Sequence, residues 1–309
     1  MLHVWTSKPR FVKLLISLAV FVSLFIAYGV KTDALAVITK HETEDPGKEA
    51  VIFKPDWAIV AAKTFDDDVE WIYELCRESG CTPYIYNMDL IPEEGLEVPH
   101  FYQGHEASAY LSYIADHYDH LHPYTVFLHG RETQWHNDIA GPETSRVLRS
   151  LRFEAIKAYG YVNLRCAGVP GCPSTLHQKD PKEHDQQYQY LLDQLPEILN
   201  NLIGMKYQDF PEDIGHQCCA QFALSREQIQ TNSKETYHKI MRWIGTTDAT
   251  DNYGIGWLAE KLWHIIFHMP AVLYVNPHGV LISLTDISLD VPRRQNAAVI
   301  YMDGVVLVH

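Results

Sequence analysis

Short apolar runs alternate with segments of helical periodicity from residue 51 onward, and this alternation is the strongest constraint on the fold. WAIVAAK, PYIYNMD and TVFLHG each suit a buried strand, and the segments after the first two carry apolar residues at helical spacing. Neighbouring parallel strands need a crossover of about a dozen residues, which these segments supply. We therefore predict an α/β fold in which a mainly parallel sheet is flanked by helices.

The pattern continues through the second half of the chain. A helix is predicted around residues 186–202, a strand at QFALS, and further helices near residues 234–244 and at GIGWLAEKLWHIIFH. We assign residues 51–275 to one α/β domain and residues 276–309 to a divergent C-terminal tail.

An uncharged apolar run, residues 14–30, precedes this domain and follows three basic residues. Its length is close to the roughly 20 residues that span a bilayer, so we predict a transmembrane signal-anchor with a cytosolic tail at residues 1–13 and a stem at residues 31–50. The alternative is a cleaved signal peptide, because DALAV offers a processing site. Both interpretations place the domain in the lumen of the secretory pathway, as a single-pass membrane protein or, after cleavage, as a secreted one.

The charge of the chain argues against one class of partner. Its formal net charge is −14, and the four basic residues around the apolar run leave 21 basic against 39 acidic residues for the rest. Such a surface repels phosphate backbones, so nucleic-acid binding is not expected. The sequence also lacks GxSxG, GxxxxGK[ST] and HExxH motifs.

Polar side chains follow each of the first three predicted strands. Ligands of parallel sheets bind at the carboxyl ends of the strands, so we expect these side chains to converge on one rim. They are Asp66, Asp67 and Asp68, then Asn87 and Asp89, then His129, Arg131, His136 and Asp138.

His129, His136 and Asp138 are candidate ligands for a divalent cation. Carboxylates with histidines suit Mn²⁺ or Mg²⁺, which neutralises phosphate charge on a nucleotide leaving group. The alternatives are structural: His129 is then a hydrogen-bonded core histidine, and Asp66 to Asp68 cap the following helix.

Glu260 and His264 are candidate catalytic residues within the last predicted helix. A carboxylate beside Trp257 and Trp263 would have a raised pKa, which suits a general base. The alternative is an exposed glutamate that pairs with a nearby lysine, and His264 shares the same face of the helix.

The six cysteines of a lumenal domain favour disulfides. We expect Cys218 and Cys219 to bond to separate partners, because bridging adjacent residues strains the intervening peptide. Cys166 and Cys172 either pair with each other or each take one of them. A redox role for Cys218 or Cys219 is the less favoured alternative.

Several blocks together resemble one family: WAIVAAKTFDDDVEWIYEL, HEASAYLSYIADHYDHL, TVFLHGRETQWHND, GYVNLRC with PGCP, CCAQFALSRE and LAEKLWHIIF. They are similar to a fungal family of proteins of unknown function, often single-pass and often encoded beside secondary-metabolite genes, with a layout like that of GT-A glycosyltransferases.

The resemblance implies a nucleotide-sugar donor near Asp66 to Asp68, with Asn87, Asp89 and Arg131 beside it. It also implies a metal at His129 and Asp138, and an acidic residue, Glu260, near a small-molecule acceptor. Two departures are a missing DxD motif after TVFL and a cysteine-free tail, which would leave one family cysteine without its partner.

The expected function is therefore that of a membrane-anchored group transferase, a glycosyltransferase-like tailoring enzyme of a fungal secondary-metabolite pathway. The missing DxD motif motivates one alternative, a catalytically silent, membrane-anchored scaffold that binds other pathway enzymes. The 17 histidines suggest a second alternative, a metal-dependent tailoring oxidase.

Overall fold

The computed structural model describes residues 56–275, except 92, 139 and 173, together with residues 281–283. The expected tail, anchor and stem at 1–13, 14–30 and 31–50 lie outside the described residues, as does most of the expected C-terminal tail. Among the described helices, none combines the length and apolar character needed to cross a membrane.

The elements alternate along the chain as the apolar pattern predicts. In order they are β1 (Trp57–Lys63), α2 (Glu70–Ser79), β2 (Thr82–Asn87), α3 (Glu106–His117), η1 (Tyr118–His120), β3 (Tyr124–His129), α4 (Thr144–Arg149), α5 (Phe153–Tyr159), β4 (Tyr161–Asn163), β5 (Leu176–His177), η2 (Glu183–Tyr188), α6 (Gln189–Ile203), η3 (Tyr207–Asp209), β6 (Asp213–Ile214), β7 (Phe222–Ser225), α7 (Arg226–Ile229), α8 (Lys234–Thr246), α9 (Asn252–Ile266), β8 (Leu273–Val275) and β9 (Leu281–Ser283).

A five-stranded sheet with the order β2-β1-β3-β7-β4 forms the centre of the described residues. β1 pairs in parallel with both β2 and β3, whereas β7 pairs antiparallel with both β3 and β4. Four strands therefore run in one direction and β7 runs against them. This confirms the α/β class and the mainly parallel sheet, whereas the antiparallel direction of β7, the strand predicted at QFALS, did not follow from the apolar runs.

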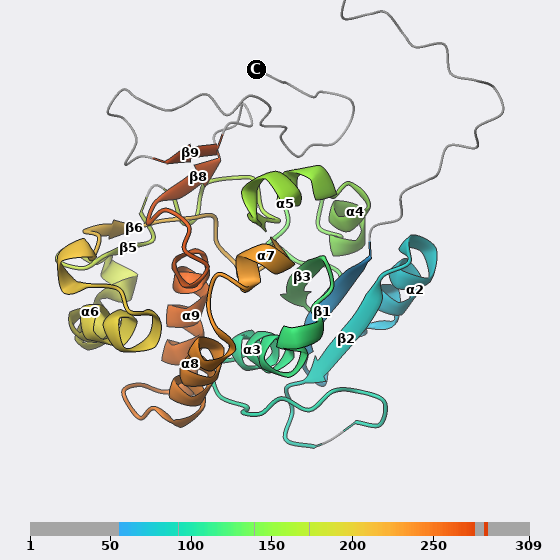
Figure 1. Ribbon diagram of the computed structural model, residues 1–309, viewed down its shortest axis with the longest axis horizontal. Coiled ribbons are helices and arrows are strands. Elements are labelled where there is room, and N and C mark those ends of the chain that lie inside the picture. The colour runs from blue at the N-terminus through green and yellow to red at the C-terminus, as the bar shows by residue number, and fades with distance from the viewer. Residues whose placement is uncertain (1–55, 92, 139, 173, 276–280, 284–309) are drawn as a thin grey trace, which may run out of the picture. The chain divides into compact units, whose positions relative to one another are not determined.

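Successive residues of each central strand point to opposite faces of the sheet, and each face has its own core. Val60, Phe127 and Phe222 belong to the core on the side of α3, α6, α8 and α9. Ile59 and Val126 belong to the core on the side of α2, α4 and α5. Both faces of the strands are apolar because both are covered, as is usual for parallel sheets. Figure 1 shows α2 and α3 on opposite sides of β1 and β2.

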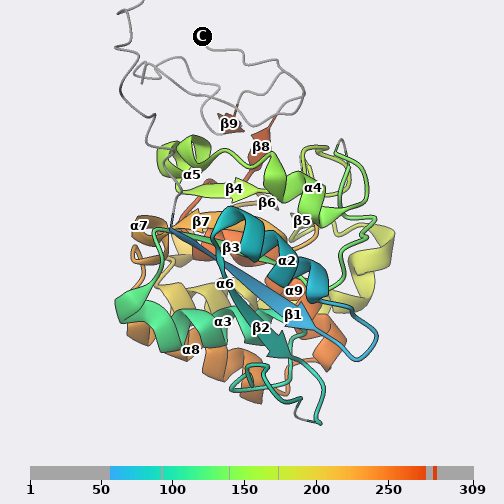
Figure 2. The ribbon, with the colours of Figure 1, turned by 90° about the vertical axis from the view of Figure 1, so that its right-hand side faces the viewer.

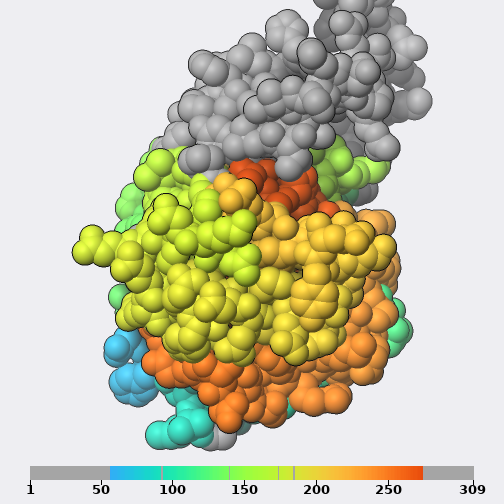
Figure 3. All heavy atoms as spheres, turned by 90° about the vertical axis from the view of Figure 1, so that its left-hand side faces the viewer, coloured from blue at the N-terminus to red at the C-terminus, as the bar shows by residue number. Residues whose placement is uncertain are grey.

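The helices of the larger core are delimited by local signals. Asp251 and Ser233 cap the starts of α9 and α8, because their side-chain oxygens accept from the backbone N–H groups of Gly254 and Thr236. Figure 2 shows α3 and α8 next to each other, and Figure 3 shows the segment of η2 and α6, in yellow, lying above the orange residues of α8 and α9.

The disulfides differ from the expected pairing. Cys218 and Cys219 bond to each other, and neither Cys166 nor Cys172 is disulfide-bonded. The backbone turns sharply just before β7, with positive φ angles of 92° at Cys219 and 48° at Ala220, and this turn lets two adjacent cysteines meet. The expectation of separate partners for Cys218 and Cys219 is therefore wrong.

A second disulfide joins Cys76, in the last turn of α2, to Cys81, directly before β2. Gly80 lies between them in the left-handed conformation and ends the helix, with φ of 81°. The sequence analysis did not single out this pair. The bond links the end of α2 directly to the start of β2.

Candidate functional site

A pocket of about 410 Å³ lies at the carboxyl ends of β1 and β3. The chain passes from β1 to β2 on one side and then returns to β3 on the other side of β1, so β1 and β3 flank a topological switch point. Open α/β sheets bind ligands at such points. The pocket is lined by Ala62, Thr64, Asp67, Met88, Tyr102, His105, Glu106, His129, Arg131, Gln134, His136 and Asn252.

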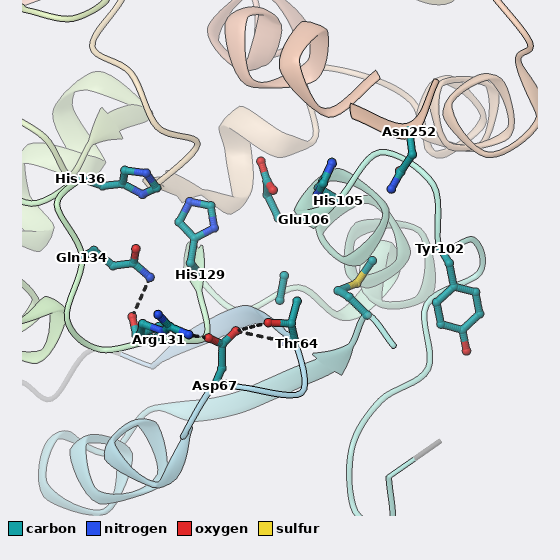
Figure 4. A pocket seen from close by; sticks show the side chains of 12 residues that line it. Thr64, Asp67, Tyr102, His105, Glu106, His129, Arg131, Gln134, His136 and Asn252 are labelled. Atoms are coloured by element: carbon teal, nitrogen blue, oxygen red, sulfur yellow. Dashed lines mark hydrogen bonds and ion pairs between the residues drawn. The ribbon is translucent and has the colours of Figure 1, made fainter. Parts of the chain in front are cut away.

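Asp67 and Arg131 form an ion pair on one side of the pocket, with Nε and Oδ1 3.2 Å apart. The other carboxylate oxygen of Asp67 accepts from the backbone N–H and the hydroxyl of Thr64, each at 3.0 Å. Asp67 is therefore held by the loop that follows β1. Arg131 remains more than half exposed and places a guanidinium beside the cavity. Figure 4 shows these side chains together at one edge of the pocket.

His129 and His136 stand next to each other, with ring centroids 4.8 Å apart. His129 Nε2 donates to the carbonyl oxygen of Cys219 at 3.1 Å, so the proton lies on Nε2 when the ring is neutral. Burial, assisted by the nearby His129 and Arg165, lowers the pKa of His136 to about 4. His136 is thus neutral at pH 7, and its buried Nδ1 makes no hydrogen bond with the described residues.

The opposite side of the pocket comes from the start of α3 and the start of α9. Glu106 is the first residue of α3, and it follows His105, whose backbone has a positive φ of 53°. Asn252 accepts from the backbone N–H of Gly104 at 2.6 Å and so ties α9 to this turn. Figure 4 shows His105, Asn252 and Tyr102 across the cavity from His136, with Glu106 between the two sides.

Glu260 lies behind His129 and is joined to it through one residue. Its Oε1 accepts from the backbone N–H of Cys219 at 3.2 Å, and the carbonyl of the same residue accepts from His129. Burial raises the pKa of Glu260, and the charge of Glu106 adds to the rise. The structure therefore brings Glu260 and His129 together, although Glu260 is not among the residues that line the pocket.

The remaining predicted donor residues have local structural contacts. Asp68 accepts from the backbone N–H of Glu70, the first residue of α2, although Val69 is the N-cap of that helix, and Asp66 is exposed outside the lining. Asn87 is buried; it donates to the carbonyl of Ile91 and accepts from the backbone N–H of Asp89, which shapes the loop after β2. Of the six predicted donor residues, the pocket contains Asp67 and Arg131.

His264 lies in the core rather than in the pocket. Its side chain is fully buried, Nε2 donates to the carbonyl of Ala271 at 2.9 Å, and its ring centroid is 4.2 Å from that of His216. Burial, followed by the charge of His216, lowers the pKa of His264 well below its usual range. It therefore stays neutral, and the structure does not bring it together with His129 in the pocket.

The three predicted metal ligands do not form a common ligand set. Asp138 accepts from the backbone N–H groups of Cys166, at 2.9 Å, and Ala167. His129 uses Nε2 for Cys219, which leaves only Nδ1 for a metal. Within the described part of the chain, no three His, Cys, Asp or Glu residues are grouped so that they could hold a metal ion. The residues present therefore do not fit the divalent cation that the resemblance implies.

Several lining residues were missed by the sequence analysis: Thr64, Met88, Tyr102, His105, Glu106, Gln134 and Asn252. Glu106 and Asn252 carry a local signal, because each opens a helix, but only the packing of α3 against α9 brings those two helix starts to the switch point. Thr64 and Gln134 stand beside Asp67 and Arg131 in the loops that the strand-end rule already marked.

The chain belongs to a protein family whose function is not known. Residues 59–280 match the sequence model of the family described as "Protein of unknown function (DUF3431)". No curated protein and no solved structure matches the chain.

Proposed function

We propose that the protein is a group transferase that moves a sugar or similar group from a nucleotide-linked donor to a small acceptor. The observation that carries this proposal is the pocket at the switch point, where Arg131, three histidines and the two carboxylates of Asp67 and Glu106 line one cavity. Its volume falls within the range of small-molecule sites. The position also agrees with the donor site that the glycosyltransferase resemblance implies.

The proposal extends to the cellular setting suggested by the sequence. Residues 14–30 would anchor the chain as a single-pass protein with its domain in the secretory lumen, or be cleaved to release it. The resemblance supports a tailoring role in a fungal secondary-metabolite pathway, with other pathway enzymes as partners. These points rest on the sequence and not on the pocket.

The charged residues of the pocket suit a transfer reaction. An acceptor hydroxyl would form the new C–O bond with the transferred carbon and give its proton to the carboxylate of Glu106. The C–O bond to the donor phosphate would break, and its electron pair would leave with the nucleoside diphosphate. Arg131 would stabilise the negative charge that develops there, as preorganised cations do in phosphate leaving-group chemistry.

Glu106 replaces Glu260 as the preferred proton acceptor in this scheme. Glu106 lines the cavity, whereas Glu260 reaches it only through Cys219 and His129. A general base must lie within hydrogen-bond reach of the proton that it takes. We therefore assign Glu260 a positioning role behind His129.

Donor binding tests the proposal directly. We expect saturating UDP- or GDP-sugars to raise the thermal unfolding midpoint of the full chain, because a ligand that binds only the folded state stabilises it. Arg131→Ala should abolish this shift. Arg149→Ala is the matched control, since Arg149 is an equally exposed arginine in an ion pair with Glu78 at 2.9 Å.

The failure of every nucleotide sugar to shift the midpoint would contradict the transferase proposal. It would favour the alternative of a membrane-anchored scaffold. The hydrogen bonds of Asp138 and His129, two of the expected metal ligands, to the backbone also support this alternative. In that case the wild-type domain should retain other pathway enzymes in affinity purification.

A further inference from the structure

Three large apolar side chains at the pocket are exposed. Phe65, Trp135 and Tyr253 have 85%, 69% and 61% of their surface accessible. Each is a direct sequence neighbour of a residue that lines the cavity. We call these three residues the apolar rim. They come from the β1–α2 loop, the β3–α4 loop and the start of α9, so three separate segments bring such a residue to one site.

Isolated exposed apolar residues are common on protein surfaces and need no function. The rim differs because each member directly adjoins, in sequence, a residue that lines the same polar pocket. Tyr207, by contrast, is 60% exposed in η3, and neither of its sequence neighbours lines the pocket. Exposed aromatic residues beside a polar cavity suit a ligand with a polar end and an apolar body.

Trp135 is held in place by its neighbours. The guanidinium of Arg165 lies 5.9 Å from the centroid of the Trp135 ring, and Arg165 Nη1 donates to the carbonyl of His136 at 2.7 Å. The rings of Trp135 and His136 are 4.4 Å apart, and the next step to His129 is 4.8 Å. A row of three rings therefore leads from the surface to the inside of the pocket.

Tyr253 provides an aromatic group on the other side. Its ring packs edge-on against His105, with centroids 6.2 Å apart. Figure 4 shows His105 and Asn252 across the cavity from His136, the neighbour of Trp135. Each of the two facing walls of the pocket therefore contains a histidine whose ring contacts an exposed aromatic residue, Trp135 at His136 and Tyr253 at His105.

We propose that the apolar rim binds the acceptor of the transfer reaction and that this acceptor is a hydroxylated aromatic or similar apolar ring compound. Its ring would stack on Trp135, and its hydroxyl would reach Glu106 inside the pocket. This inference names the substrate class of the site and rests on the proposed function for the identity of the reaction, although ring binding can be measured without it.

The test uses 4-methylumbelliferone, a planar fluorescent ring compound with one hydroxyl, and the full chain. Its fluorescence anisotropy should rise on titration with the wild-type protein. Trp135→Ser should raise the Kd roughly tenfold, because stacking on one aromatic side chain contributes about that much. Trp135→Phe keeps a stacking ring and should stay within about threefold of wild type.

Tyr207→Ser is the matched control, because it removes an equally exposed aromatic residue outside the rim. It should leave the Kd unchanged. Absence of binding to the wild-type chain, an unchanged Kd in Trp135→Ser, or an equal loss in Tyr207→Ser would each overturn the proposal. Trp135 is exposed, so a wild-type unfolding midpoint for Trp135→Ser should verify that the fold is intact.

The two proposals fail separately. If nucleotide sugars bind but the rim variants bind the ring compound as wild type does, the acceptor assignment falls and the transferase proposal stands. If the ring compound binds through Trp135 but no nucleotide sugar binds, the rim is a ligand site and the reaction assignment falls.

Discussion

At the scale of single residues, Cys219 is the link between the pocket and the residue that the sequence marked as a base. Its carbonyl accepts from His129 in the pocket, and its N–H donates to Glu260 behind it. The bond to Cys218 fixes the residue at this turn. His129 and Glu260 therefore affect each other through one backbone unit as well as through charge.

Glu260→Gln should stabilise the protein at alkaline pH. Burial raises the pKa of Glu260, so the folded state favours its neutral form. The free energy of unfolding of the wild type therefore falls as pH rises through that raised pKa. Glutamine keeps an oxygen for the Cys219 N–H but carries no charge, and we expect a gain on the order of 1 kcal/mol at pH 8.

The gain should disappear at pH 4, where the wild-type side chain is itself neutral in the folded state. Urea denaturation at both pH values measures the difference. Glu94→Gln is the control, because Glu94 is exposed. A stabilisation that is the same at pH 4 and pH 8 would show that the charge of Glu260 is not its cause.

At the scale of elements, the contact of α9 with the start of α3 forms one wall of the pocket. Gly256 lies in α9 opposite His105, and a Cβ on Gly256 would come within 2.5 Å of His105 Cδ2 and 3.2 Å of Cγ. The glycine therefore permits a close approach. His105, which this contact positions, is one of the residues that line the pocket.

Gly256→Ala should destabilise the fold by about 1–3 kcal/mol, the usual cost of overpacking, although alanine is the better helix former by about 1 kcal/mol. We expect most of this cost to disappear in a His105→Ala background, because the ring at 2.5 Å is gone and only the contact with the Cβ of residue 105, at 3.3 Å, remains. A double-mutant cycle by chemical denaturation measures this coupling. An equal loss in both backgrounds would contradict the proposed contact.

Much of the element order could be predicted because β1, β3 and β7 are largely apolar runs and each main helix has its own periodicity. The rule that ligands bind at strand ends marked the end of β3 at His129 and the loops that contain Asp67, Arg131 and His136. It did not distinguish Asp67 from its neighbours Asp66 and Asp68, because the choice depends on the approach of Arg131 from β3. Asp67 and Arg131 are separated by 64 positions in the sequence.

The cysteine pairing escaped prediction for a related reason. Adjacent cysteines bond here because the backbone at Cys219 and Ala220 takes positive φ angles, which no local signal announces for non-glycine residues. Likewise, the sequence suggested Asp138 as a metal ligand, but in the fold its Oδ2 accepts from the backbone N–H groups of Cys166 and Ala167. The local sequence indicates which polar side chains follow the strands, whereas long-range packing determines which of these side chains reach the pocket.

At the scale of the whole molecule, the larger core contains buried histidines that the sequence analysis read as catalytic or left unassigned. His216 and His264 are both buried and in contact with each other. Burial lowers the pKa of His216 to about 4 and that of His264 well below its usual range. Together with His136, whose pKa is also about 4, they tie the stability of the described domain to pH.

We expect the protein to lose stability as pH falls from about 6.5 towards 4. In this window the unfolded chain binds protons on these histidines while the folded chain does not, so unfolding takes up protons and becomes more favourable. A fully buried histidine such as His216 changes the free energy of unfolding by up to roughly 1.4 kcal/mol per pH unit.

Urea denaturation at pH 7.5, 6.5, 5.5 and 4.5 measures the slope of the free energy of unfolding against pH. His136→Gln should reduce that slope, whereas His120→Gln, at an exposed position, should leave it unchanged. A free energy of unfolding that is constant over this range would mean that the histidines are not held neutral by the fold.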